Sequence, residues 1–146
     1  MIRSCDLPIL FLDFDGVMHP ASYSKGQQRF CNAPWLEAVL AKHPLRIVVS
    51  SSWRFHYPLD EILGSMPPKL AQAIVGATGN AHIGPWARFH EIKAWLAKHD
   101  PLADWRAADD AGFEFPKPCP ELIACDPQHG FGAKQAGELA IWLGNR

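Results

Sequence analysis

Hydrophobic residues follow two periods along this chain. Four short segments are mostly apolar throughout, which is typical of strands buried on both faces of a parallel sheet. The predicted strands are residues 9–13, 45–49, 105–108 and 122–125. Three longer segments carry apolar residues at every third or fourth position, which predicts amphipathic helices. The predicted helices are residues 34–43, 85–99 and 133–143. Strand, helix and strand in succession favour a right-handed crossover between parallel strands, so the pattern predicts an α/β fold.

The remaining segments predict connections. Residues 58–75 carry two short helical patterns, each with proline near its start, which we place on the flank of the sheet. Residues 17–33 lack clear periodicity and predict a loop or a small flap, and residues 76–84 predict a glycine-containing loop. A chain of 146 residues is long enough for one full core, so we expect a single domain over residues 1–146.

The composition is that of a globular protein, with 48% hydrophobic and 20% charged residues. A net charge of −1 excludes the strong basic field that drives non-specific nucleic-acid binding, but it leaves room for a local basic groove. The four cysteines form no C-x-x-C pair and the chain starts without a signal-peptide pattern, which favours free thiols and a cytoplasmic location. No apolar run approaches the ~18 residues of a membrane span, so we expect no membrane association.

The first predicted strand ends in two aspartates, Asp13 and Asp15, followed by Gly16. Side chains alternate along a strand, so both carboxylates point the same way. At about 4 Å and an effective dielectric near 20 they repel by roughly 4 kcal/mol, and the pair therefore requires a cation or a shared proton. Mg²⁺ fits because it prefers oxygen ligands and often phosphate oxygens. One carboxylate beside a phosphate can attack phosphorus while the other protonates the departing oxygen.

Two other interpretations exist for the D-F-D-G string by itself, a surface turn and a calcium-binding loop. The calcium loop is the weaker of them. An EF-hand loop needs a third Asp or Asn before its glycine, whereas Gly16 follows Asp15 directly, and no Glu occupies the twelfth loop position.

Polar residues also follow the second and third predicted strands. The serine triplet 50–52 and Arg54 follow the second strand, where hydroxyls and a guanidinium can bind phosphate oxygens. A helix cap and turn is the alternative for the serines. Asp109 and Asp110 follow the third strand and can supply a further oxygen ligand to a metal, with exposed turn charges as the alternative.

Two cations, Arg88 and Lys93, lie on the predicted helix 85–99. Most helix cations are simply solvated, and this interpretation stays open for both. His19, His56 and Cys31 lie where they could line an entrance, but an ordinary packing or surface role is the preferred interpretation for each.

Taken in order, these strings resemble the motifs of the haloacid dehalogenase-like (HAD) phosphohydrolases: D-F-D-G-V, a serine after the next strand, a basic residue on a helix, and an acidic pair. More narrowly, they resemble the HAD domain of bacterial RNA-repair proteins. The resemblance implies a three-layer Rossmann-like (HAD-like) parallel sheet with helices on both faces. Only residues 16–33 and 89–108 are available for a cap domain, so the domain is expected to be capless or to have a minimal cap.

The resemblance also implies roles for individual residues. Asp13 would be the nucleophile that forms an aspartyl-phosphate, and Asp15 the acid and then the base. The Mg²⁺ cofactor would be held by Asp13, by the backbone carbonyl of Asp15, and by the pair Asp109 and Asp110. Two assignments are ambiguous: which of the three serines and which of the two helix cations match the family motifs. We choose Ser51 and Arg88 to complete the catalytic set. The candidate substrate-binding residues are Ser50, Ser52, Arg54 and Lys93.

The predicted function is therefore a Mg²⁺-dependent phosphatase, a phosphoric monoester hydrolase, acting through an aspartyl-phosphate. A phosphorylated nucleic-acid end is the narrower hypothesis for its substrate, since a site without a lid is open to a macromolecule. The alternatives are a small-metabolite phosphatase and a non-catalytic HAD-fold binding or regulatory domain. A dehalogenase is disfavoured because its nucleophile is not followed by a second Asp like Asp15. The sequence defines neither the physiological substrate nor the oligomeric state.

Overall fold

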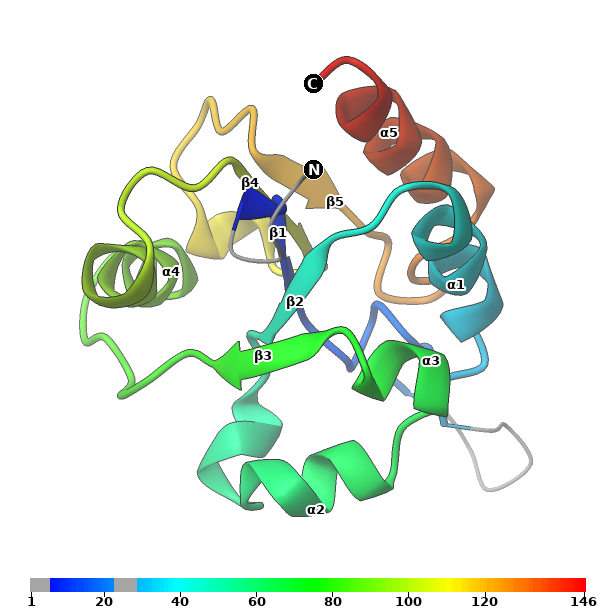
Figure 1. Ribbon diagram of the computed structural model, residues 1–146. Coiled ribbons are helices and arrows are strands. Elements are labelled where there is room, and N and C mark those ends of the chain that lie inside the picture. Colours follow the sequence, from blue (N-terminus) through cyan, green and yellow to red (C-terminus); the bar gives the residue numbers. More distant parts are fainter. Residues whose placement is uncertain (1–5, 23–28) are drawn as a thin grey trace.

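The chain folds around one parallel sheet (Figure 1). The computed structural model describes residues 6–22 and 29–146. Five strands lie in the order β3-β2-β1-β4-β5, and every neighbouring pair is parallel. The strands are β1 (Ile9–Leu12), β2 (Arg46–Val49), β3 (Ile74–Ala77), β4 (Trp105–Asp109) and β5 (Leu122–Ala124). This arrangement confirms the predicted α/β fold with a parallel sheet.

Helices cover both faces of the sheet, which makes three layers (Figure 1). Helix α4 (Ala87–His99) lies on one face, and α1 (Ala33–Lys42) and α5 (Ala133–Gly144) lie together on the other. The short elements are η2 (Ser52–Phe55), α2 (Leu59–Gly64), α3 (Pro68–Ala71) and η3 (Gly112–Glu114). The Rossmann-like, three-layer architecture expected from the resemblance is therefore the observed one.

The central strand β1 explains why its sequence is continuously apolar. All four of its residues are fully buried. Leu10 and Leu12 pack with residues of α1 and α5, whereas Ile9 and Phe11 pack with residues of α4. A strand covered on both faces has no solvent side, so neither set of alternate positions can be polar.

One strand was missed by the sequence analysis. The second helical pattern within 58–75 ends early as α3, and its apolar end belongs instead to the edge strand β3. Gly76 lies in this strand against α4, where an added Cβ would come into van der Waals contact with the Trp95 indole. A four-residue strand that contains glycine has too little apolar periodicity to be told from a helix end.

The start of α4 also differs from the prediction. The helix begins at Ala87, and Trp86 before it has a left-handed backbone (φ 57°) and is 46% exposed, although it lies within the predicted amphipathic helix 85–99. A left-handed residue cannot continue the helix, so its side chain leaves the apolar stripe. Ile92 and Leu96 are buried as expected.

The connections that could hold a cap domain are short. Helix α4 joins β4 through residues 100–104 alone. Between β1 and α1, residues 13–22 and 29–32 form turns, with no helix or strand of a cap among them, and the rest of the expected flap lies outside the described residues. In this part of the chain the site at the carboxyl ends of the strands has no built lid.

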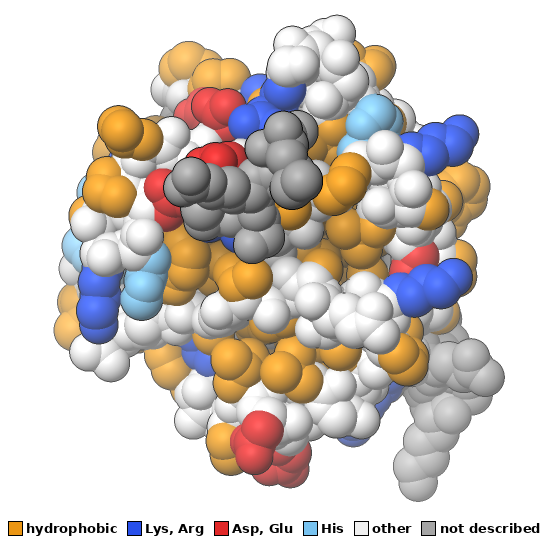
Figure 2. All heavy atoms as spheres, in the orientation of Figure 1, with side chains coloured by type: hydrophobic (Ala, Val, Ile, Leu, Met, Phe, Trp, Pro, Cys, Tyr) orange, Lys and Arg blue, Asp and Glu red, His pale blue; other side chains and the backbone are white. Residues whose placement is uncertain are grey.

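Charges on the surface are mixed, as the near-neutral net charge implies. Figure 2 shows lysine and arginine side chains spread among acidic, apolar and neutral ones over the face that it draws. Cys31, Cys119 and Cys125 are free thiols, as expected, and Cys5 lies outside the described residues. No helix in the described ranges combines the length and apolarity needed to cross a bilayer.

Candidate active site

Three carboxylates converge at the carboxyl edge of the sheet. Ligand oxygens of Asp13, Asp109 and Asp110 all lie within 4.8 Å of one another. The sheet register brings them together, because Leu12 of β1 pairs with Ala108 of β4 and each strand then continues into acid. Gly16 makes the close approach feasible, since it has a φ of 79° and a side chain there would overlap the Asp110 carboxylate.

Among the described residues, too little positive charge surrounds this cluster. Burial, and then the nearby Asp109 charge, raise the pKa of Asp13 to about 9. Burial likewise raises the pKa of Asp109 to about 6, although Arg88 opposes the shift. The Arg88 guanidinium is the cation in contact, with Nη1 3.6 Å from Asp13 Oδ1 and 3.6 Å from Asp109 Oδ2. The residues present therefore fit a divalent cation, because three hard oxygen donors lie close together and two of them carry unfavourable charge.

Asp15 has a different environment from this cluster. Its Oδ1 accepts a hydrogen bond from His19 Nε2 at 2.8 Å and its Oδ2 accepts one from Trp53 Nε1 at 3.1 Å. The backbone N–H of Phe30 donates to His19 Nδ1, so the ring proton of a neutral His19 lies on Nε2, facing Asp15. The Asp15 side chain is 45% exposed while that of His19 is fully buried. Asp15 is thus oriented by two donors and open to a ligand.

The three serines take three different roles. Ser51 Oγ accepts a hydrogen bond from the backbone N–H of Trp53 at 3.2 Å and caps η2, and Ser52 is exposed at the start of that turn. Among the described residues, Ser50 Oγ is buried without a hydrogen-bond partner. Ser50 follows Val49, the partner of Leu12, so it stands beside Asp13 at the strand ends. An unsatisfied buried hydroxyl costs about 1–3 kcal/mol, which a ligand oxygen here would relieve.

Of the three predicted cations, only Arg88 reaches the carboxylates. Its Nη1 also donates to the Ser50 carbonyl, which fixes the guanidinium over the strand ends. Lys93 is exposed on α4, about 140° around the helix from Arg88, so it does not join the site. Arg88, and not Lys93, therefore lies beside the carboxylates, although the catalytic role of Arg88 stays a prediction.

Arg54, predicted to bind substrate, has its guanidinium paired inside the protein, close enough to Asp13 and Arg88 to interact with their charges. It donates to the backbone carbonyls of Gly79 and Ser51 at 3.0 Å each, and to Glu91 Oε1 at 2.7 Å. Glu91 Oε2 in turn accepts from the backbone N–H of His82. Arg54 therefore fixes η2 and the loop after β3 to α4, one turn beyond Arg88.

The sequence analysis missed three residues of this neighbourhood: Trp53, His19 as a donor to Asp15, and Glu91. Glu91 did carry a signal. It is an acid directly beside Ile92 on the apolar stripe of α4, where a charge is buried only if it is paired. His19 and Trp53 carried none that separates them from packing residues.

We expect the metal-free protein to lose stability as the pH rises from about 4 to about 9. The pKa values of folded Asp13 and Asp109, about 9 and about 6, lie above their ordinary value of 3.8. The folded state therefore binds more protons than the unfolded state in this window, and the free energy of unfolding falls by up to about 1.4 kcal/mol per pH unit for each group. Urea unfolding in EDTA across the window measures the slope. Excess Mg²⁺ should flatten it, and a metal-free stability that rises with pH would contradict the assignment.

Comparison with known proteins agrees with this geometry. A family model described as the HAD domain in Swiss Army Knife RNA repair proteins matches residues 9–136, a range that contains every site residue above. No curated protein and no solved structure matches the chain. Since the family match covers most of the sequence from β1 into α5, the chain belongs to the HAD domain family of Swiss Army Knife RNA repair proteins.

Proposed function

We propose that this domain is a Mg²⁺-dependent phosphomonoester hydrolase that works through an aspartyl-phosphate on Asp13. The observation that carries the proposal is the separation of the two motif aspartates. Asp13 is buried in the carboxylate cluster with Arg88, whereas Asp15 is turned outward onto His19 and Trp53. This separation supports a division of labour in which one carboxylate is the nucleophile and the other is the acid and base, as displacement at phosphorus requires.

The reaction then follows in two displacements. An Asp13 carboxylate oxygen attacks phosphorus, the bond from phosphorus to the leaving oxygen breaks, and the Asp15 carboxyl gives its proton to that oxygen. In the second displacement Asp15 takes a proton from a water molecule, whose oxygen attacks the phosphorus of the aspartyl-phosphate. Inorganic phosphate leaves and the Asp13 carboxylate is restored. Both proton transfers use one group, which His19 and Trp53 hold in a single orientation.

The other residues stabilise the transferred group. Arg88 and the unpaired Ser50 hydroxyl are donors at the strand ends beside Asp13, and we infer that they bind the phosphoryl oxygens. Mg²⁺ would be held by Asp13, Asp109 and Asp110, with the Asp15 backbone carbonyl, and when bound it supplies the positive charge that offsets the carboxylates and the phosphoryl group. Ser50 replaces Ser51 in this proposal because the Ser51 hydroxyl is occupied by the η2 cap.

For the substrate we propose a phosphorylated nucleic-acid end, in the narrowest form a polynucleotide 3′-phosphate. Two facts support this choice: the family description refers to RNA repair proteins, and the described parts of the connections before α1 and after α4 build no lid over the site. An open site accepts the end of a long chain without the closure that a small metabolite usually requires.

The test is phosphate release from a 3′-phosphorylated oligoribonucleotide, a 5′-phosphorylated one and β-glycerol phosphate, each with Mg²⁺ or with EDTA. We expect turnover of the 3′-phosphorylated oligonucleotide that is at least about 100-fold faster with Mg²⁺, because the carboxylate cluster binds productively only when its charge is offset. Equal rates in EDTA would contradict the metal. Faster turnover of β-glycerol phosphate would contradict the substrate, and oligonucleotide binding without any turnover would favour the non-catalytic alternative.

A further inference from the structure

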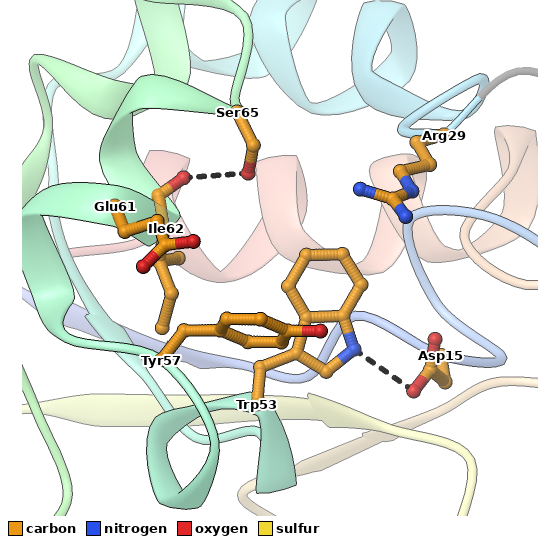
Figure 3. A pocket seen from close by; sticks show the side chains of 7 residues that line it. All are labelled: Asp15, Arg29, Trp53, Tyr57, Glu61, Ile62 and Ser65. Atoms are coloured by element: carbon orange, nitrogen blue, oxygen red, sulfur yellow. Dashed lines mark hydrogen bonds between the residues drawn. The ribbon is translucent and has the colours of Figure 1, made fainter.

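A pocket opens beside the active site on the side of Asp15 (Figure 3). Its volume is about 300 Å³, at the lower end of the range for small-molecule sites. It lies between the η2–α2 segment and the chain that enters α1. Its lining residues are Asp15, Arg29, Trp53, Tyr57, Glu61, Ile62 and Ser65.

Aromatic rings and a cation dominate this pocket. Trp53 and Tyr57 stand 6.4 Å apart between ring centroids at an angle of 69°, and the Arg29 guanidinium carbon lies 5.8 Å from the Trp53 ring centroid. Figure 3 shows the Tyr57 hydroxyl reaching across the Trp53 indole, with Arg29 on the opposite side of the hollow. Tyr57 is 48% exposed, so about half of its surface is open to a ligand. Ring faces and a guanidinium plane are what a planar, π-rich ligand stacks on.

Polar groups stand at the edge of the same hollow. The Glu61 carboxylate and the Ser65 hydroxyl face it in Figure 3. Ser65 Oγ donates its proton to the Ile62 carbonyl at 2.8 Å, so both residues offer acceptor oxygens to the pocket. Acceptors at the edge of a stacking platform suit a ring that carries N–H donors. The set is therefore polar enough to select a heteroaromatic ring over a plain apolar one.

Asp15 connects this pocket to the reaction. It lines the pocket, and Trp53, the main ring of the pocket, donates to its Oδ2. In the proposed reaction Asp15 protonates the leaving oxygen, so whatever is attached to that oxygen emerges on the side of Asp15. The pocket thus lies on the leaving-group side of the phosphoryl site.

We propose that this pocket binds the base of the terminal nucleoside from which the phosphate is removed, stacked on the Tyr57 ring with its edge toward Trp53. The inference rests on the proposed phosphatase function and adds to it a subsite for one ring. The volume suits a single nucleoside. On the face that Figure 2 draws, lysine and arginine side chains are spread among acidic and apolar ones, which agrees with recognition of an end by a local pocket. Asp15 would then be held by the same indole that orients the leaving group.

The test compares two 3′-phosphorylated oligoribonucleotides that differ only at the last residue, which either carries its base or is abasic. For the Tyr57→Ala protein we expect kcat/KM on the base-bearing substrate to fall about 10-fold, the loss that removal of one stacking contact brings, with little change on the abasic one. Tyr57→Phe should retain the wild-type preference because it keeps the ring. The matched control is Phe55→Ala, since Phe55 is 51% exposed, stacks on Arg54 and lies outside this pocket.

A binding measurement separates this inference from the function on which it rests. In the Asp13→Asn protein, which keeps the pocket, fluorescence anisotropy gives the affinity for both labelled oligonucleotides without turnover. A base-dependent affinity that Tyr57→Ala removes would support the pocket even if no substrate is hydrolysed. Equal affinities with and without the base, or a Tyr57→Ala loss that is the same for both substrates, would overturn it.

Discussion

Replacing Asp13 by asparagine is expected to reduce phosphate release by about 10⁴-fold or more in kcat, because the amide cannot act as the nucleophile. The change should leave the site in place. Asp13 Oδ1 accepts the backbone N–H of Phe14 at 2.8 Å, and the amide oxygen of asparagine can accept the same bond. Steady-state phosphate release with saturating Mg²⁺ measures the loss.

The control for folding is built into the same variant. Because burial and Asp109 raise the pKa of Asp13 to about 9, a charge at this position is costly in the metal-free protein, and the neutral asparagine should be at least as stable as wild type in EDTA at neutral pH. Asp60→Asn, at an exposed position of α2, should retain full activity. Substantial turnover by Asp13→Asn would remove the aspartyl-phosphate from the mechanism, and a loss of activity accompanied by unfolding would leave the nucleophile without support.

The sequence predicts most of the fold because the central strands are unambiguous. β1 is apolar throughout since it is covered on both faces, and β2 shares that pattern over Ile47–Val49. The carboxylates at the ends of β1 and β4 also follow from the sequence, since neighbouring parallel strands end at the same edge. The edge strand β3 could not be predicted in the same way, because Gly76 and its intermediate burial give it neither a strand nor a helix pattern.

The parts of the site that escaped prediction depend on contacts between distant segments. A guanidinium after a strand looks the same in sequence whether it binds phosphate or, like Arg54, pairs with an acid on another element. The sequence also does not show which serine hydroxyl is free to bind a ligand. The cap made by Ser51 and the unpaired hydroxyl of Ser50 are visible only once the structure of η2 is known. His19 and Trp53 reach Asp15 through a turn and a short helix whose geometry no periodicity encodes.

Two parts of the structure position the residues of the site. The sheet register places the carboxylates, whereas α4 places Arg88, and α4 is fixed to η2 by the buried pair of Arg54 and Glu91. The side chains of this pair are only 6% and 7% exposed. Burial of both charges means that removal of either one leaves the other as a buried charge without its countercharge. The position of Arg88 therefore depends on Glu91, a residue outside the cluster of three aspartates.

Glu91→Ala is accordingly expected to destabilise the protein by about 3–5 kcal/mol, the cost of leaving the buried Arg54 guanidinium unpaired. Urea unfolding measures the difference. The matched control is Asp104→Ala, which removes the pair of Asp104 with Arg146 at 3.0 Å, where the side chains are 64% and 31% exposed. An exposed pair contributes less than about 1 kcal/mol, so the control should unfold almost like wild type.

If the Glu91→Ala protein does not fold, Glu91→Gln tests the same ion pair with Arg54. The amide oxygen can still accept from Arg54 or from the His82 backbone, which should make its unfolding free energy intermediate between alanine and wild type. Its kcat should fall although Asp13 and Asp15 are unchanged, because the first turn of α4 carries Arg88 and loses its fixed position. A glutamine protein with wild-type stability and wild-type kcat would show that the pair supports neither α4 nor Arg88, and the sheet alone would then have to place the guanidinium.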